Sequence, residues 1–130
     1  MVLTYVGSSV ALAYLFAEPR QPRPDVWERQ LVSSRLLEYK IWTRVHARGG
    51  TTAMRAGARA LLSGIELFEM GREGLARAVS PFPIHVRTLD GLHLATMHFL
   101  LQQGDAVEIV SYDNRLLSAA VMLGVAAAPL

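Results

Sequence analysis

Three acidic residues of this 130-residue chain are set apart from its other acids by their neighbours. Glu38 lies in SSRLLEYK, one turn after Ser34, on an otherwise apolar helix face. Asp90 lies in RTLDGLHLAT, in the first turn of the most apolar helix, and Asp113 directly follows an apolar strand in IVSYDNRLLSAA. Each has a simple structural explanation, since a carboxylate at a helix N-terminus is stabilised by about 0.3–1 kcal/mol. Together, however, they lie where a parallel sheet would bring them to one edge.

Carboxylates that converge in this way need a cation, because their mutual repulsion raises the free energy of the ionised state. Clustered carboxylate oxygens select Mg²⁺ or Mn²⁺ rather than zinc. Such an ion activates water and stabilises a phosphoryl group during hydrolysis. The three acids therefore indicate metal-dependent phosphoryl chemistry.

Other chemistries have little support in the sequence. The four histidines show no metal-ligand pairing, and His93 and His98, five residues apart, fall on different faces of a helix, so surface or packing roles are expected. Neither a GxSxG elbow nor a Walker loop is present. Ser8 and Ser9 have no histidine–acid pair to activate them, which favours a helix-capping role.

Strands and helices alternate along the chain, which predicts an α/β domain with a mainly parallel sheet. Strands are expected at 3–6, 31–33, 65–70, 107–110 and 125–127, and helices at 8–16, 34–49, 53–62, 72–79, 88–102 and 115–123, with a helical turn at Asp25. The expected caps are Ser8 or Ser9, Ser34, Thr51 or Thr52, Thr88, and Asp113 or Asn114. Ligands of such sheets bind at the carboxyl ends of the strands, which directs attention to the turns at Gly7 and Tyr112.

Composition sets broad limits. Hydrophobic residues make up 52% and charged residues 18%, as in a globular domain, and we expect one domain over residues 1–130. The net charge of +2 permits a polyanionic partner, and Lys40 is the only lysine. The absence of cysteine excludes disulfides and thiolate metal sites. It also fits the cytoplasmic location that we expect. We expect no signal peptide and no membrane helix.

Four stretches in order resemble the conserved blocks of PIN domains, with VapC-type toxins of bacterial and archaeal toxin–antitoxin pairs as the nearest match: YVGSSVALAYLF, SSRLLEYKIWTRV, RTLDGLHLAT and IVSYDNRLLSAAVMLGV. The resemblance covers essentially the whole chain, and the last two blocks are the most specific. It implies a three-layer α/β/α sandwich that cleaves RNA with Mg²⁺ or Mn²⁺. It also implies a homodimer silenced by a VapB-like antitoxin.

By motif position, Glu38, Asp90 and Asp113 match the family's second, third and fourth acids, which hold the catalytic metal. Ser8 and Ser9 match the hydroxyl residues that orient the first acid. Two arginines that flank the acidic blocks, Arg87 and Arg115, are candidates for contact with RNA or the antitoxin, or for packing.

The departure from the family is Gly7, which takes the position of the first acid at the end of the first strand. The loss of one metal ligand predicts weak metal binding and impaired or absent cleavage. Such a change arises either as an escape or inactivating substitution or in a natural pseudo-enzyme. Two other functions stay open: a non-catalytic PIN-like domain that binds RNA or an antitoxin, and a PIN nuclease of RNA processing.

Overall fold

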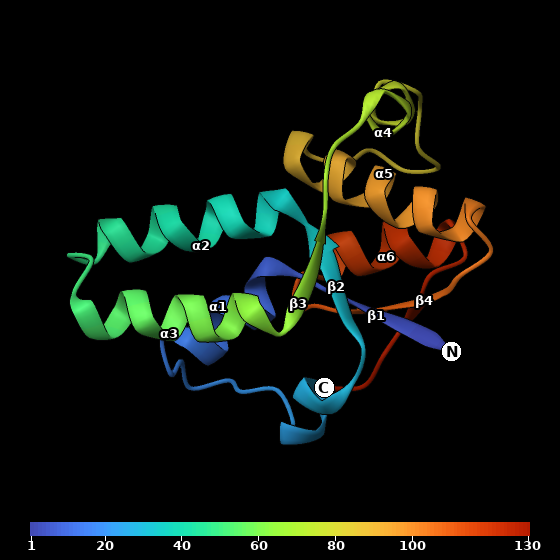
Figure 1. Cartoon of the computed structure of the whole chain (residues 1–130). Helices are drawn as coiled ribbons and strands as arrows, with labels where there is room; N and C mark the ends of the chain where they lie inside the picture. Colours follow the sequence, from blue (N-terminus) through green and yellow to red (C-terminus); the bar gives the residue numbers. More distant parts are fainter.

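The computed structural model describes residues 1–130, and all of its strands belong to one sheet (Figure 1). The strands are β1 (Val2–Val6), β2 (Leu31–Ser34), β3 (Ile65–Phe68), β4 (Ala106–Val110) and β5 (Ala126–Ala127). The helices are α1 (Ser8–Leu15), the 3₁₀ helix η1 (Pro24–Glu28), α2 (Arg35–Ala47), α3 (Thr52–Ser63), α4 (Arg72–Ala78), α5 (Thr88–Gln102) and α6 (Asn114–Met122). The prediction of alternating strands and helices is confirmed.

The sheet has the strand order β3-β2-β1-β4-β5, and every neighbouring pair is parallel. β1 is the central strand and pairs along its whole length with β4, with Val6 opposite Val110. The carboxyl ends of β1 and β4 therefore lie side by side. The strand order reverses direction between β1 and β4, since β2 lies on one side of β1 and β4 on the other, so a crevice is expected at this edge.

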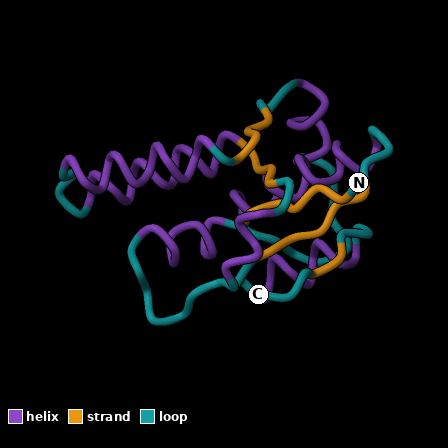
Figure 2. The backbone as a smooth tube through the Cα atoms, turned by 60° about the horizontal axis from the view of Figure 1, so that its bottom comes forward, coloured by secondary structure: helices purple, strands orange, loops and turns teal.

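Helices cover both faces of the sheet, which confirms the three-layer α/β/α architecture. On one face α1, α2 and α3 bury a cluster that includes Val10, Leu37 and Ile41. On the other face α5 and α6 bury a second cluster that includes Leu94, Met97 and Leu116. Figure 2 shows α2 and α3 as a helical pair that extends beyond the sheet. No helix combines the length and the apolar character needed to cross a bilayer.

Of the five helix caps predicted from the sequence, three are confirmed and two are wrong. The side chains of Ser34, Thr51 and Asp113 accept hydrogen bonds from backbone N–H groups at the starts of α2, α3 and α6. By contrast, α1 is preceded by Gly7 and α5 by Arg87, and neither helix has a side-chain cap. The expected caps at Ser8 or Ser9 and at Thr88 were wrong, because these residues already lie inside their helices.

Candidate active-site cleft

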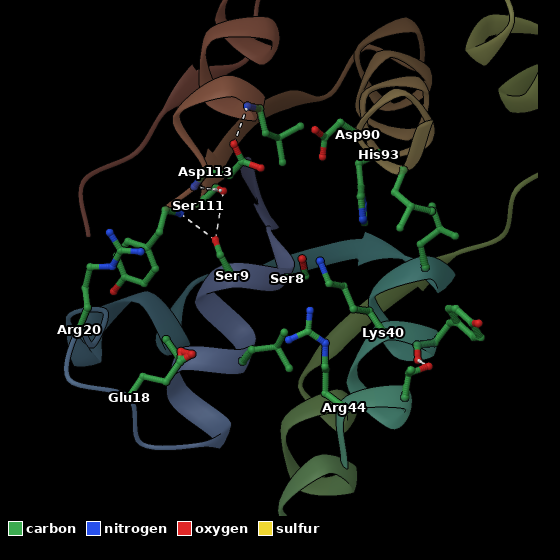
Figure 3. Close-up of a pocket in the computed structure, with 18 of the residues that line it drawn as sticks. Ser8, Ser9, Glu18, Arg20, Lys40, Arg44, Asp90, His93, Ser111 and Asp113 are labelled. Atoms are coloured by element: carbon green, nitrogen blue, oxygen red, sulfur yellow. Dashed lines mark hydrogen bonds between the residues drawn. The ribbon is translucent and has the colours of Figure 1, made fainter. Parts of the chain in front are cut away.

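A cleft of about 690 Å³ opens at the carboxyl ends of β1 and β4 (Figure 3). Its walls come from the start of α1, the loop after α1, the middle of α2, the first turns of α5 and the turn between β4 and α6. The charged residues of the lining are Glu18, Arg20, Lys40, Arg44, Asp90 and Asp113. The cleft is therefore where the topology of a parallel sheet places a ligand site.

Two of the three predicted acids, Asp90 and Asp113, meet in this cleft, and we refer to them as the acid pair. Asp113 Oδ1 accepts hydrogen bonds from the backbone N–H groups of Arg115 (3.0 Å) and Leu116 (3.2 Å). The pKa of Asp90 is raised, first by burial of its carboxyl group and then by repulsion from Asp113. Asp113 is thus close enough to disfavour the ionised form of Asp90.

Glu38, the third predicted acid, does not lie in the cleft. It lines a separate surface hollow near Trp42 and Arg59, and its carboxylate pairs with Arg35 at 3.2 Å. Arg35 in turn pairs with Glu69 at 2.7 Å. No group of three acidic or histidine side chains in the structure is arranged to hold a metal ion. The expected convergence of all three acids is therefore wrong in the case of Glu38.

The side of α2 that faces the cleft carries Lys40 and Arg44 instead. Residues 38 and 40 are roughly 200° apart around the helix axis, so they flank the buried face of α2 on opposite sides. In Figure 3 Lys40 and Arg44 extend from α2 toward Ser8 in the middle of the cleft, and Asp90 and Asp113 enter from the other side. Neither cation has a carboxylate within 4.0 Å.

Gly7 is buried at the end of β1, directly before the cleft residues Ser8 and Ser9, and has an ordinary extended backbone (φ −74°, ψ 148°). Its backbone conformation therefore does not require glycine, but its surroundings favour it. A Cβ atom at this position would lie 2.9 Å from Ser111 Cβ and 3.1 Å from the Val110 carbonyl oxygen. β4 thus approaches β1 so closely at this point that a side chain fits only if the backbone shifts.

We expect Gly7→Ala to lower the free energy of unfolding by about 1–3 kcal/mol, since overpacking a closed site costs that much. Gly71 provides a matched control: it also precedes a helix, has φ −83°, and a Cβ there meets nothing within 4 Å. Urea denaturation of Gly7→Ala and Gly71→Ala measures the difference. Equal stability of the two variants would show that β4 yields freely at this point.

The two serines after Gly7 have different environments. Ser9 Oγ accepts a hydrogen bond from the Tyr112 backbone N–H at 2.8 Å and lies 3.3 Å from Ser111 Oγ. Ser9 therefore ties the start of α1 to the turn that carries Asp113. Ser8 lines the cleft next to Lys40 (Figure 3). The predicted role of Ser8 and Ser9 was to orient an acid at position 7, and this chain has glycine there.

Arg87 and Arg115, the predicted nucleic-acid or antitoxin contacts, are exposed at the starts of α5 and α6 and do not line the cleft. Both nevertheless lower the pKa of Asp90 through their charges, as does Lys40, although burial and Asp113 outweigh them. Three cationic side chains therefore act on Asp90 from different sides.

His93 is a cleft residue whose environment the sequence did not reveal. Its ring is buried, its Nδ1 lies 2.6 Å from the Tyr5 hydroxyl, and the two rings meet edge to face. Burial lowers the pKa of His93 to about 4 and raises that of Tyr5 to about 12. The expected packing role of this histidine is confirmed, with a specific partner on the central strand.

The donor set of the cleft does not fit a tightly held divalent cation. Mg²⁺ and Mn²⁺ favour several oxygen ligands, but no third carboxylate joins the acid pair. Gly7 has no side chain, Glu38 lies outside the cleft, and Glu18, on the loop after α1, is not grouped with the pair. Moreover, Lys40, Arg87 and Arg115 already place positive charge near Asp90. A further divalent ion would be repelled by these groups.

A parallel α/β/α sandwich with an acid pair at the carboxyl edge of its central strands defines a PIN-like nuclease scaffold. The chain is 33% identical to ribonuclease VapC46 of Mycobacterium tuberculosis, over 97% of this chain and 96% of that protein. It is 28% identical to ribonuclease VapC47 of the same species, over 94% of this chain and 93% of that protein. No family model matches the chain.

The chain therefore belongs to the VapC family of ribonucleases, the family that the four sequence blocks resemble. The family makes it a toxin-type endoribonuclease, and VapC nucleases are in general metal-dependent enzymes that pair with VapB antitoxins. Within this family of metal-dependent enzymes, the cleft of this chain has few groups that could bind a metal ion.

Proposed function

We propose that this chain is the toxin of a VapBC-like pair, with a cleft that binds RNA and an impaired capacity to cleave it. The observation that carries this proposal is the cleft itself, in which the acid pair faces Lys40 and Arg44 across the carboxyl ends of β1 and β4. Basic side chains in such a groove contact the phosphates of a nucleic acid, and acidic ones mark the position of cleavage chemistry.

Of the predicted metal ligands, Asp90 and Asp113 remain the proposed pair, with Mg²⁺ or Mn²⁺ as the proposed ion. When bound, such an ion supplies charge stabilisation at the scissile phosphate. With Gly7 in place of an acid and Glu38 outside the cleft, we expect that binding to be weak. The homodimer and the VapB-like antitoxin remain predictions from the family.

RNA binding tests this function directly. We expect a fluorescent single-stranded RNA to bind with an affinity that falls with salt, with a log–log slope of about −2 if Arg20, Lys40 and Arg44 each contact a phosphate. Arg44→Glu should weaken binding, and Arg72→Glu, the same charge change on α4 away from the cleft, should not. Fluorescence anisotropy measures both.

Product formation on the same RNA should stay near background with Mn²⁺ present. The absence of RNA binding by the folded chain, or equal losses in the Arg44 and Arg72 variants, would refute the proposed cleft function. Efficient cleavage by the unmodified chain would refute its impairment.

A further inference from the structure

One carboxylate oxygen of Asp90 lacks a hydrogen-bond partner. Its Oδ2 atom is buried and accepts no hydrogen bond from any group of the protein. A buried carboxylate oxygen without a partner loses its hydration without compensation, which is costly unless a cation or a proton donor compensates it. Asp113 adds a second negative charge nearby, and this repulsion also raises the pKa of Asp90. The acid pair therefore requires positive charge.

Of the cationic side chains that act on Asp90, Lys40 is the one that lines the cleft. Lys40 extends into the cleft from α2, and its charge acts on both Asp90 and His93. His93 cannot share this role, because its ring is held by Tyr5 and its lowered pKa keeps it neutral. Arg44, one turn further along α2, adds a second positive charge on the same side of the cleft.

Cationic side chains of the protein supply part of this positive charge without an added ion. The charges of three cationic side chains act on Asp90, in the order Arg87, Lys40 and Arg115. Arg87 and Arg115 are exposed, so water screens much of their effect. Arg87 acts more strongly than Lys40 on Asp90, but Lys40 is only partly exposed and is the one of the three that lines the cleft, so water screens its charge less.

We propose that the Lys40 ammonium takes the place of the divalent cation in this cleft, balancing Asp90 and Asp113 and binding the phosphodiester backbone of single-stranded RNA. This inference rests on the proposed RNA-binding function. The complex with RNA then forms without a metal ion. Lys40 is compact, charged and flexible, so one ammonium can contact a carboxylate and a phosphate at once.

Direct Mn²⁺ binding tests the first half of the inference without any activity assay. Electron paramagnetic resonance of free Mn²⁺, titrated with protein, gives the dissociation constant. We expect weak binding by the unmodified chain, tighter binding by Lys40→Met, and at least about tenfold tighter binding by Lys40→Glu, because ligand charge sets the affinity. Arg72→Met and Arg72→Glu are the matched controls on α4 and should behave as the unmodified chain. Unchanged Mn²⁺ affinity in both Lys40 variants would overturn the inference.

RNA binding with and without metal tests the second half. We expect the unmodified chain to bind a single-stranded RNA equally well in EDTA and in Mg²⁺. Lys40→Met should bind about tenfold more weakly in EDTA, by a similar factor for every RNA sequence, and should lower the salt slope. Thermal unfolding verifies that each variant is folded.

The outcomes separate the two proposals. If the folded chain binds no RNA in either buffer, the proposed function fails. If it binds RNA only with Mg²⁺, or if Lys40→Met binds as tightly as the unmodified chain in EDTA, the function stands and the replacement of the metal by Lys40 is overturned.

Discussion

Gly7→Asp combined with Lys40→Glu is expected to raise Mn²⁺-dependent RNA cleavage at least about 100-fold above that of the unmodified chain. Loss of one electrostatic contact to the transition state typically costs 100- to 1,000-fold in rate, so restoring acids to the cleft should recover a factor of that order. Both positions border the acid pair: Gly7 at the end of β1 and Lys40 on the cleft side of α2. Cleavage of a fluorophore-quencher RNA measures the gain.

The single variants show which position limits activity. Gly7→Asp alone leaves the Lys40 ammonium opposite the acids, so we expect a smaller gain than in the double variant. It also places a Cβ 2.9 Å from Ser111 Cβ, and the backbone must shift to accept it. An aspartate at this position can, however, cap α1, which now has no side-chain cap, and so recover about 1 kcal/mol relative to alanine.

Asp90→Asn in the double variant is the control for the site, and it should return cleavage to background. A folded double variant that cuts no RNA would remove the acid pair from the catalytic site. Equal activity of Gly7→Asp and the double variant would mean that Lys40 does not oppose the metal.

The sequence predicted the fold well because its local signals agreed with one another. Apolar strands, caps such as Ser34 and Asp113, and stops such as Gly64 all indicated the same order of elements. The two wrong caps, at α1 and α5, have one physical origin. Each helix begins one residue earlier than its first hydroxyl residue suggests, because Gly7 and Arg87 already have extended backbones suited to a helix start.

The candidate site was harder to predict than the fold. Asp90 and Asp113 follow from the rule that ligands gather where parallel strands end. Glu38 and Lys40 cannot be distinguished in this way, since both flank the apolar face formed by Leu37 and Ile41. Which flank faces the cleft depends on how α2 packs against its neighbours, and this is a tertiary property. The close approach of Gly7 to Ser111 joins residues 104 positions apart, so the sequence around Gly7 does not indicate it.

The buried pair of Tyr5 and His93 leads to the second large effect, a loss of stability on acidification that depends on His93. The pKa of this histidine is about 4 in the folded chain, against an ordinary value of 6.5. Between these values the unfolded chain binds more protons than the folded one, so the free energy of unfolding falls as the pH falls. At pH 5 this loss is about 2 kcal/mol relative to pH 7.5, and it approaches about 3 kcal/mol near pH 4.

Urea denaturation at pH 7.5 and pH 5 measures this loss, and a His93→Gln variant isolates it. An amide at position 93 can still accept a hydrogen bond from the Tyr5 hydroxyl but does not titrate, so the variant should lose about 2 kcal/mol less than the unmodified chain on going to pH 5.

Asp90 has the opposite effect on the pH dependence of stability, since its raised pKa makes the folded chain take up a proton first, but Asp90 is present in both proteins. His85→Gln, on an exposed histidine, is the matched control and should keep the full pH dependence. If His93→Gln keeps it as well, the ring of His93 already titrates freely in the folded protein, and the contact with Tyr5 does not hold it neutral.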